Sequence, residues 1–353
     1  MITAWKILLE EVLTTSTRAL LILLYTPKLP SWMTHLEFFE RFDLLKEAAS
    51  DEKVKLELGC KISRERVGKE SDHMMSGKHP VKAMSYIYDL GLFYVAFAFP
   101  ENSDPPIVAN CDWCCVSHMK AAWDLAISVH SAVSHPMMLD EQQKLYVYSA
   151  LFFPLRNMFY LDENSKKTEV TNYIIKKSLK LPTCLAKSVV NIHAASRKFA
   201  ELLSLFESNV VSGTVKEVLE DVYLEIPTDT LKRVYAGVIL DEIKDLWRVA
   251  LAISILSYYP EAEDAHSQQD RRKEKYMEVE RSITELGLDE VWKPLLKGKT
   301  IMGVIQMTPG PLVGEWKKRV FRWQLAHPKG TADDCIEWMK QSQSKRQKVE
   351  CSI

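Results

Sequence analysis

Apolar residues recur every three or four positions along most of this 353-residue sequence, which is the spacing of one face of an α-helix. The longest such stripe runs from Leu185 through Val189 and Ile192 to Phe206. Short joints rich in proline, glycine and polar residues separate the stripes, and the strict alternation typical of half-buried strands is scarce. The sequence therefore predicts an all-α fold built from many helices.

Composition places the chain among ordinary globular proteins. Apolar residues make up 47%, charged residues 26% and the formal net charge is −1, which argues against disorder and against a wholly basic nucleic-acid protein but allows a local basic face. The early apolar run 19–25 is far shorter than the roughly 20 residues that span a bilayer, so we expect no membrane partner. Seven unevenly spaced cysteines favour reduced thiols in an intracellular protein, without indicating cytosol, nucleus, mitochondrion or plastid.

Capping residues predict several helix boundaries. Ser63 is placed to cap a helix that runs to Ser76, and Pro80 opens the next helix. Two prolines and several polar residues predict a loop over 101–110. The polar, charged segment 260–272 lacks an apolar period, which predicts a surface loop or linker.

Further along, the apolar pattern predicts one continuous helix over 230–259. Thr331, followed three residues later by Asp334, predicts the start of the final helix.

One cysteine cluster has part of the spacing of a metal site. Cys111, Cys114, Cys115 and His118 lie close in sequence, but a structural zinc site needs a second ligand pair that the chain lacks. We therefore assign no metal ligand. We expect His193, between apolar positions of a helix, to be a core histidine. Since no nucleophile or phosphate-loop motif accompanies it, we assign no catalytic residue.

Three cations, Lys61, Arg64 and Arg66, are predicted at a helix start, where positive charge opposes the helix dipole. A phosphate or an acidic partner helix would both fit them. The structural alternative is pairing with Glu65, Glu70 or a neighbouring carboxylate.

The tail carries the clearest basic surface. Its helix interleaves basic residues, which we expect to face outward, with inward apolar residues: Lys317, Lys318, Arg319 and Arg322 among Trp316, Val320 and Trp323. Such a face could track an RNA backbone, and a merely solvated helix face is the alternative.

Several separate strings resemble the tRNA nucleotidyltransferases, or CCA-adding enzymes, of eukaryotic and particularly plant type. The neck strings are KISRERVGKE (61–70) and HPVKAMSYIYDLGLFYVAFAFPE (79–101). The body and tail strings are DEIKDLWRV (241–249), ELGLD (285–289) and MTPGPLVGEWKKRVFRWQLAHPKGTADDCIEWM (307–339). They occur in the family order, and the resemblance extends from about Leu44 to the C-terminus.

The resemblance implies an enzyme family that adds C, C and A to tRNA 3′ ends, using Mg²⁺ with CTP and ATP. Carboxylates of a catalytic head hold two metal ions, and a helical neck, body and tail hold the tRNA by shape and backbone charge. By this resemblance the neck is 44–103, the body 104–260 and the tail 261–353. The expected partner is tRNA, with no DNA, and the RNA-binding candidates are Lys61, Arg64, Arg66, Lys317, Lys318, Arg319 and Arg322.

The sequence departs from the family in the parts that do chemistry. The glycine-serine start, the D-x-D carboxylate pair, the R-R-D-F string and the E/D-D-x-x-R nucleotide-recognition motif are absent. We therefore expect a head-less tRNA-binding module that binds no cofactor and transfers no nucleotide. The alternatives are a non-enzymatic helical module whose basic tail binds an acidic protein, and a full enzyme with a broken gene model.

The segment 1–43 does not resemble the family in this frame. Back-translation of the family segment before the neck, with suitable synonymous codons and read from the second base, gives KLPSWMTHLEFFERFD, which is residues 28–43. We predict that the chain up to about Asp43 is an out-of-frame translation of the nucleotide-recognition motif, and that the frame returns near Leu44.

Overall fold

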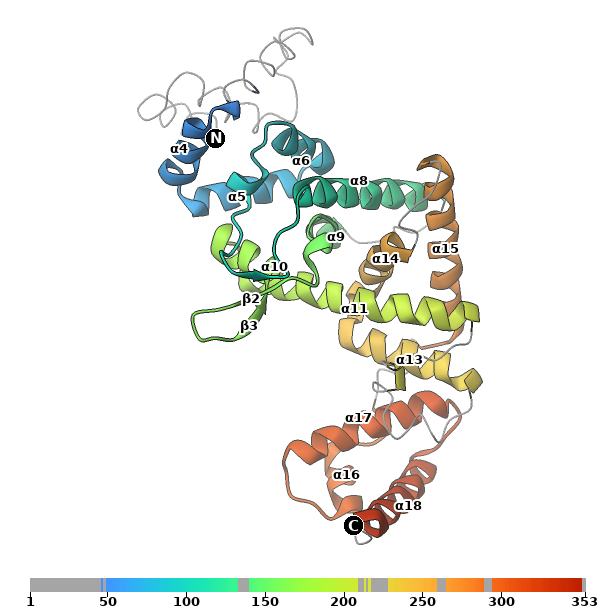
Figure 1. Cartoon of the computed structure of the whole chain (residues 1–353). Coiled ribbons are helices and arrows are strands. Elements are labelled where there is room, and N and C mark those ends of the chain that lie inside the picture. The colour runs from blue at the N-terminus through green and yellow to red at the C-terminus, as the bar shows by residue number, and fades with distance from the viewer. Residues whose placement is uncertain are drawn as a thin grey trace. The chain divides into compact units, whose positions relative to one another are not determined.

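The computed structural model describes residues 46, 49–132, 140–208, 213, 215, 216, 228–258, 265–288 and 294–350. Most of these residues are helical, which confirms the predicted fold class, and one small antiparallel sheet is the exception (Figure 1). The predicted out-of-frame segment 1–43 lies outside the described residues. Among the described helices, none combines the length and apolar character that crossing a membrane requires.

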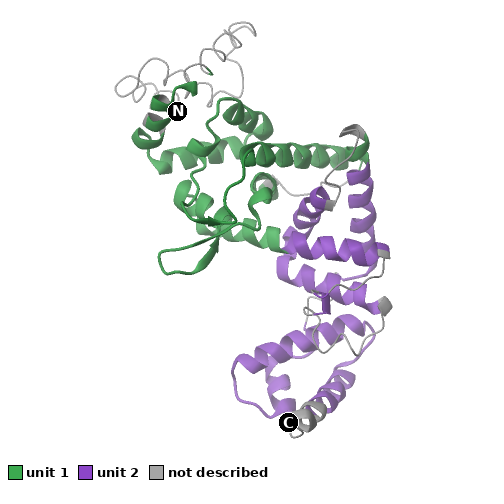
Figure 2. Cartoon of the chain, viewed as in Figure 1, with its two compact units in different colours: residues 1–194, 259–270 green, residues 195–258, 271–353 purple. Residues whose placement is uncertain are grey.

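The chain divides into two compact units, residues 1–194 with 259–270 and residues 195–258 with 271–353 (Figure 2). The divisions at 194/195 and 270/271 fall within the helices Thr183–Ser208 and Ala265–Glu285, and the division at 258/259 follows the last residue of the helix Trp247–Tyr258. They differ from the boundaries at 103/104 and 260/261, and the division into neck, body and tail stays a prediction.

Unit 1 contains the sheet and most helices of the first half of the chain. Its helical elements are α4 (Glu52–Lys61), α5 (Arg64–Met75), α6 (Pro80–Asp89), α7 (Phe93–Ala96), α8 (Cys111–His130), α9 (Asp140–Leu151), the 3₁₀ turn η1 (Phe153–Leu155), α10 (Val170–Tyr173), the π-helical turn η2 (Ile174–Ser178) and the first part of α11 (Thr183–Ser208). Its core joins buried apolar side chains of these helices, among them Met84, Phe97, Phe152, Ile174 and Val189.

The predicted caps of unit 1 are confirmed. The Ser63 hydroxyl accepts a hydrogen bond from the backbone N–H of Arg66, and α5 ends with Ser76 as its C-cap. Pro80 is the first residue of α6, where its missing N–H costs no helical hydrogen bond. These boundaries follow from residues within one turn of the helix end.

The sheet was not predicted. Strands β1 (Ser103–Asp104), β2 (Phe159–Leu161) and β3 (Lys167–Glu169) pair antiparallel in that order. At the β2–β3 turn, Asp162 Oδ1 accepts the backbone N–H groups of Asn164 and Lys166, each at 2.9 Å. Strands of two or three residues are too short for an alternating pattern to be visible in sequence.

Unit 2 consists of helices from the second half of the chain. They are the rest of α11, α13 (Thr228–Ile243), the 3₁₀ turn η4 (Lys244–Leu246), α14 (Trp247–Tyr258), α15 (Ala265–Glu285, from Arg271 onward), α16 (Gly298–Ile305), α17 (Pro311–Ala326) and α18 (Ala332–Glu350).

Two helix predictions for this half of the chain are wrong. The single helix predicted over 230–259 is broken at Lys244, which has a φ of +53°. The loop predicted over 260–272 is helical from Ala265 onward. Gln269 explains why no apolar stripe is visible there, since its side-chain amide donates hydrogen bonds to the Asp124 carbonyl and the Ser128 hydroxyl of α8.

Helix α17 packs on both sides within unit 2. One side meets α13, where a Cβ added to Gly237 would lie 2.3 Å from Leu325 Cδ2. The other side joins α16 and α18 in a cluster that includes Trp316, Trp323 and Met339. The final helix begins after Thr331, as predicted.

Candidate nucleic-acid interface

The three cations Lys61, Arg64 and Arg66 occupy different environments. Lys61 is exposed and is the last residue of α4, so the prediction that it stands at a helix start is wrong. A cation at a helix C-terminus is favoured by the helix dipole. Arg66 is half-buried in the first turn of α5. Contact of either side chain with RNA stays a prediction.

Arg64 is held by the protein itself. Its Nε donates to the Ser178 carbonyl at 2.7 Å, and its terminal nitrogens donate to the carbonyls of Val95 and Ala96 at 2.8 and 2.6 Å and to the Ser178 hydroxyl. Neither a phosphate nor a carboxylate is needed to explain this guanidinium. It joins α5 to α7 and to the end of η2.

The four basic residues of α17 separate into an exposed and a buried pair. Lys317 and Lys318 are exposed, whereas Arg319 and Arg322 are only 4% and 7% exposed. The expectation that all four face outward is therefore wrong for the two arginines. The reason is that α17 packs against α13 on one side and against α16 and α18 on the other. Only a narrow strip of its surface is left exposed to solvent.

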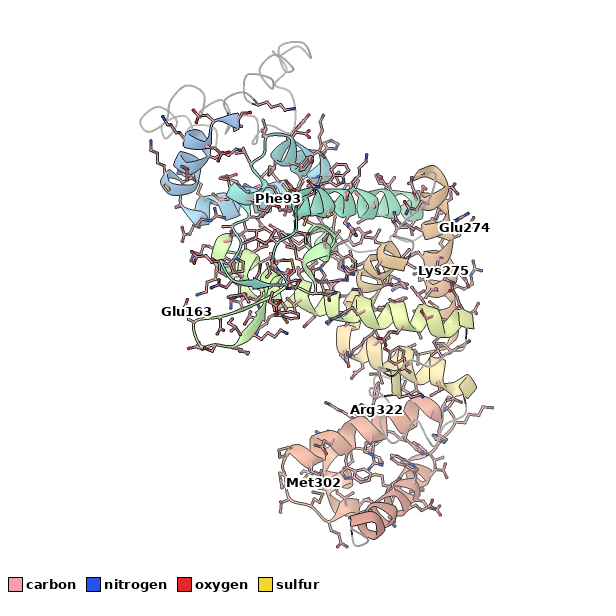
Figure 3. The ribbon with its side chains drawn as sticks, in the orientation of Figure 1. Phe93, Glu163, Glu274, Lys275, Met302 and Arg322 are labelled. Carbon is pink, nitrogen blue, oxygen red and sulfur yellow. The ribbon has the colours of Figure 1, made fainter. Side chains whose placement is uncertain are left out.

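Each arginine has a structural explanation. The Arg319 guanidinium carbon lies 4.3 Å from the Trp316 ring centroid and 5.6 Å from that of Trp338, so aromatic faces cover it. Arg322, labelled on α17 in Figure 3, precedes Leu325 by three positions and shares the helix face that meets α13.

Lys317 borders a groove of about 320 Å³ between α16 and α17. We call this the tail groove; it is lined by Pro294, Leu296, Lys297, Gly298, Ile301, Lys317, Val320, Phe321 and Gln324. A Cβ added to Gly298 would lie 3.3 Å from Lys317 Nζ, so this ammonium lies beside the N-terminus of α16. Exposed Lys297 and Lys299 flank Gly298.

Positive charges at a helix N-terminus repel the positive end of the helix dipole, and an anion reduces that repulsion. The tail groove therefore combines a basic rim with an apolar floor. Lys297 and Lys299 are not among the residues predicted to bind RNA. A lysine–glycine–lysine run before an apolar stripe was the available signal, and its proximity to Lys317 depends on tertiary packing.

The cysteine cluster and His193 have local partners. His118 Nδ1 lies 2.9 Å from the Cys114 carbonyl, within α8. Nowhere in the described part of the chain do three or more His, Cys, Asp or Glu side chains gather closely enough to hold a metal ion. His193 is buried, with Nε2 2.8 Å from the Ser149 carbonyl, which confirms it as a core histidine.

Comparison with curated proteins finds CCA-adding enzymes. The chain is 24% identical to the mitochondrial CCA tRNA nucleotidyltransferase of Saccharomyces cerevisiae over 316 residues, covering 82% of this chain and 54% of that protein. It is 22% identical to tRNA nucleotidyltransferase cca2 of Schizosaccharomyces pombe, and the match covers 86% of this chain and 58% of that protein. It is also 22% identical to the mitochondrial CCA tRNA nucleotidyltransferase of Candida glabrata, and the match covers 86% of this chain and 59% of that protein.

The chain is similar to CCA tRNA nucleotidyltransferases over 82% to 86% of its residues. This confirms the resemblance drawn from the neck, body and tail strings. The chain spans between 54% and 59% of the length of these CCA tRNA nucleotidyltransferases. No protein-family model matches the chain. No solved structure matches it.

Proposed function

We propose that this chain holds tRNA for the addition of CCA to the tRNA 3′ end. The observation that carries the proposal is its similarity, over 82% to 86% of its residues, to three CCA tRNA nucleotidyltransferases. Helices with an exposed basic rim suit a substrate that is recognised by shape and backbone charge.

Two lysines of the tail groove and the exposed lysines next to them in sequence supply the proposed phosphate contacts. Lys317 and Lys318 on α17, with Lys297 and Lys299 at the start of α16, are exposed in the same unit. Lysine ammonium groups replace the counterions of RNA phosphates, and release of those counterions favours binding at low salt. Arg319 and Arg322 support this surface from inside and are not proposed as RNA contacts.

The proposal includes binding without nucleotide transfer by the chain as given. Two metal ions beside a triphosphate need a carboxylate pair, and the sequence has neither the D-x-D pair nor the R-R-D-F string of the family. The measurement is incorporation of labelled ATP or CTP into tRNA that lacks its CCA end. Incorporation above background by rigorously purified chain would contradict this part of the proposal.

Binding is tested by the salt dependence of tRNA affinity. With three to five phosphate contacts, the slope of log affinity against log salt should be roughly −2 to −4. The double variant Lys317→Gln with Lys318→Gln should flatten this slope, whereas Lys187→Gln, which removes an exposed lysine of α11, should leave it unchanged. Absence of salt-dependent tRNA binding would overturn the proposal. An acidic protein held by the same lysines, and not displaced by tRNA, would favour the interaction module instead.

A further inference from the structure

A second pocket of unit 2 lies where α13 ends and α14 begins. Its volume is about 300 Å³, at the lower end of the roughly 300–1,000 Å³ found for small-molecule sites. It is lined by Leu240, Lys244, Asp245, Trp247, Arg248, Ile283, Thr284 and Leu288, and we call it the Trp247 pocket.

The helix break at Lys244 forms this pocket. Lys244 has a φ of +53°, a conformation that few non-glycine residues adopt, and it interrupts what would otherwise be one helix. The single turn η4, which begins at Lys244, also contains Asp245, and Trp247 opens α14. The Lys244 side chain is 61% exposed at the rim and is paired with Asp241.

Two planar groups among the lining residues lie against each other. The Arg248 guanidinium carbon lies 4.2 Å from the Trp247 ring centroid, and Arg248 Nε donates to Glu280 Oε1 at 2.7 Å. The Glu280 side chain is only 11% exposed, so the pair fixes the guanidinium before a ligand arrives. A tryptophan ring and a fixed guanidinium together give flat surfaces on which another ring can stack.

We propose that the Trp247 pocket binds one unstacked nucleotide. These flat surfaces suit a base, and the apolar side chains of Leu240, Ile283 and Leu288 remove its faces from water. Asp245 and Thr284 supply polar atoms for the edge of the base, and Lys244 at the rim suits a phosphate. The nucleotide can belong to an RNA strand or be free, because both present the same base and phosphate.

Binding of a tRNA nucleotide in this pocket rests on the proposed function. The experiment therefore tests nucleotide binding in the pocket separately from tRNA binding by the chain. Affinity is measured for tRNA and, separately, for free CMP and AMP. Each measurement compares the unsubstituted chain with the variant Trp247→Leu and with the control variant Trp113→Leu. Trp113 is 53% exposed in unit 1 and is not a lining residue of the pocket, so its replacement removes an exposed tryptophan without changing the pocket. Trp247→Leu should weaken binding of the ligand about tenfold, the loss expected for one stacked base, and Trp113→Leu should not.

Ultraviolet crosslinking of the same ligands, with the site mapped by mass spectrometry, gives a readout that a folding defect alone would not produce. The crosslink should map to η4 or the start of α14. Lys244→Asn offers a second variant, because asparagine tolerates a positive φ while removing the charge. It should reduce the magnitude of the salt slope for tRNA by about 1.

The possible outcomes distinguish nucleotide binding in the Trp247 pocket from the proposed tRNA-binding function. If tRNA binds with the expected salt slope but equally well to Trp247→Leu, with no crosslink at the pocket, the inference is overturned and the proposed function stands. If CMP or AMP binds in a Trp247-dependent way and tRNA does not, the pocket is supported and the tRNA function is overturned. If no ligand binds, both fail.

Discussion

Arg64 donates two hydrogen bonds to Ser178 across 114 residues of sequence, to the carbonyl at 2.7 Å and to the hydroxyl at 2.5 Å. Ser178 ends the π-helical turn η2, and its hydroxyl also accepts the backbone N–H of Ala98 at 2.8 Å. The last carbonyls of a helical segment need partners outside it. Arg64 therefore caps η2 and connects it to α7.

Replacing Arg64 with lysine should destabilise unit 1 by about 2–3 kcal/mol, since the charge remains but the forked set of donors is lost. Amide hydrogen exchange should become faster over residues 95–98 and 174–181. Lys69→Ala, on the exposed face of the same helix, is the control and should change stability by less than about 0.5 kcal/mol. Unchanged protection in Arg64→Lys would contradict the capping role.

Gly68 should tolerate no side chain. A Cβ there would lie 1.6 Å from the Leu179 carbonyl oxygen, so Gly68→Ala must push α5 away from the chain after η2. We expect a loss of about 3 kcal/mol or more in the free energy of unfolding. Gly59→Ala in α4 is the matched variant: its Cβ would meet no atom within 4 Å, and it should stabilise the helix by about 0.5–1 kcal/mol. Urea unfolding measures both changes.

The buried and exposed cations of α17 should respond differently to substitution. Arg319→Met removes the contacts with Trp316 and Trp338 and should lower stability, while the salt slope of tRNA binding by folded chain stays the same. Lys318→Gln should reduce the magnitude of that slope by about 1 and leave stability unchanged. Binding titrations at several salt concentrations, with thermal unfolding of each variant, separate the two. A flattened slope in Arg319→Met would mean that this arginine reaches phosphate after all.

The start of α18 should lose stability in acid. The backbone N–H and the hydroxyl of Thr331 donate to the Asp334 carboxylate and lower its pKa. Because folding favours the ionised form, this contribution is present above the unfolded pKa of about 3.9 and is lost as pH falls through the lower folded value. Asp334→Asn should remove that part of the pH dependence. Unfolding midpoints from pH 7 down to about pH 3 provide the measurement.

The described cysteines should label in the order of their exposure. Cys60 and Cys184 are exposed, whereas Cys115 and Cys335 are buried, and burial raises the pKa of Cys335 to about 11. Because the thiolate is the reactive form, alkylation near pH 8 should modify Cys60 and Cys184 first. Cys335 should react only when urea opens the cluster of α16, α17 and α18. Fast modification of Cys335 in folded chain would contradict its burial.

Local rules predicted much of the helical pattern. Ser63, Pro80 and Thr331 were identified as helix starts because a cap depends on atoms within one turn of the chain. His193 was placed in the core because its neighbours along the helix are apolar.

Features that depend on distant packing were missed. Nothing near Lys244 in the sequence indicates a helix break, and the local pattern of α17 does not reveal that Arg322 is buried. The role of Arg64 depends on residues from Val95 to Ser178, so the basic string 61–66 suggested a ligand instead of a cap. Four lining residues of the Trp247 pocket come from the quoted family string 241–249, but the pocket forms only where they meet Ile283, Thr284 and Leu288 from a distant part of the chain.

Gly237 and Leu325 bear on which substitutions related chains can accumulate. A methyl group at 237 would come within 2.3 Å of a fully buried leucine, so the two positions share one volume. Alanine at 237 should be accepted only together with a smaller residue at 325, and the double substitution should cost less stability than the sum of the two single substitutions. These positions on α13 and α17 are therefore expected to co-vary among homologues, although they are 88 residues apart in sequence.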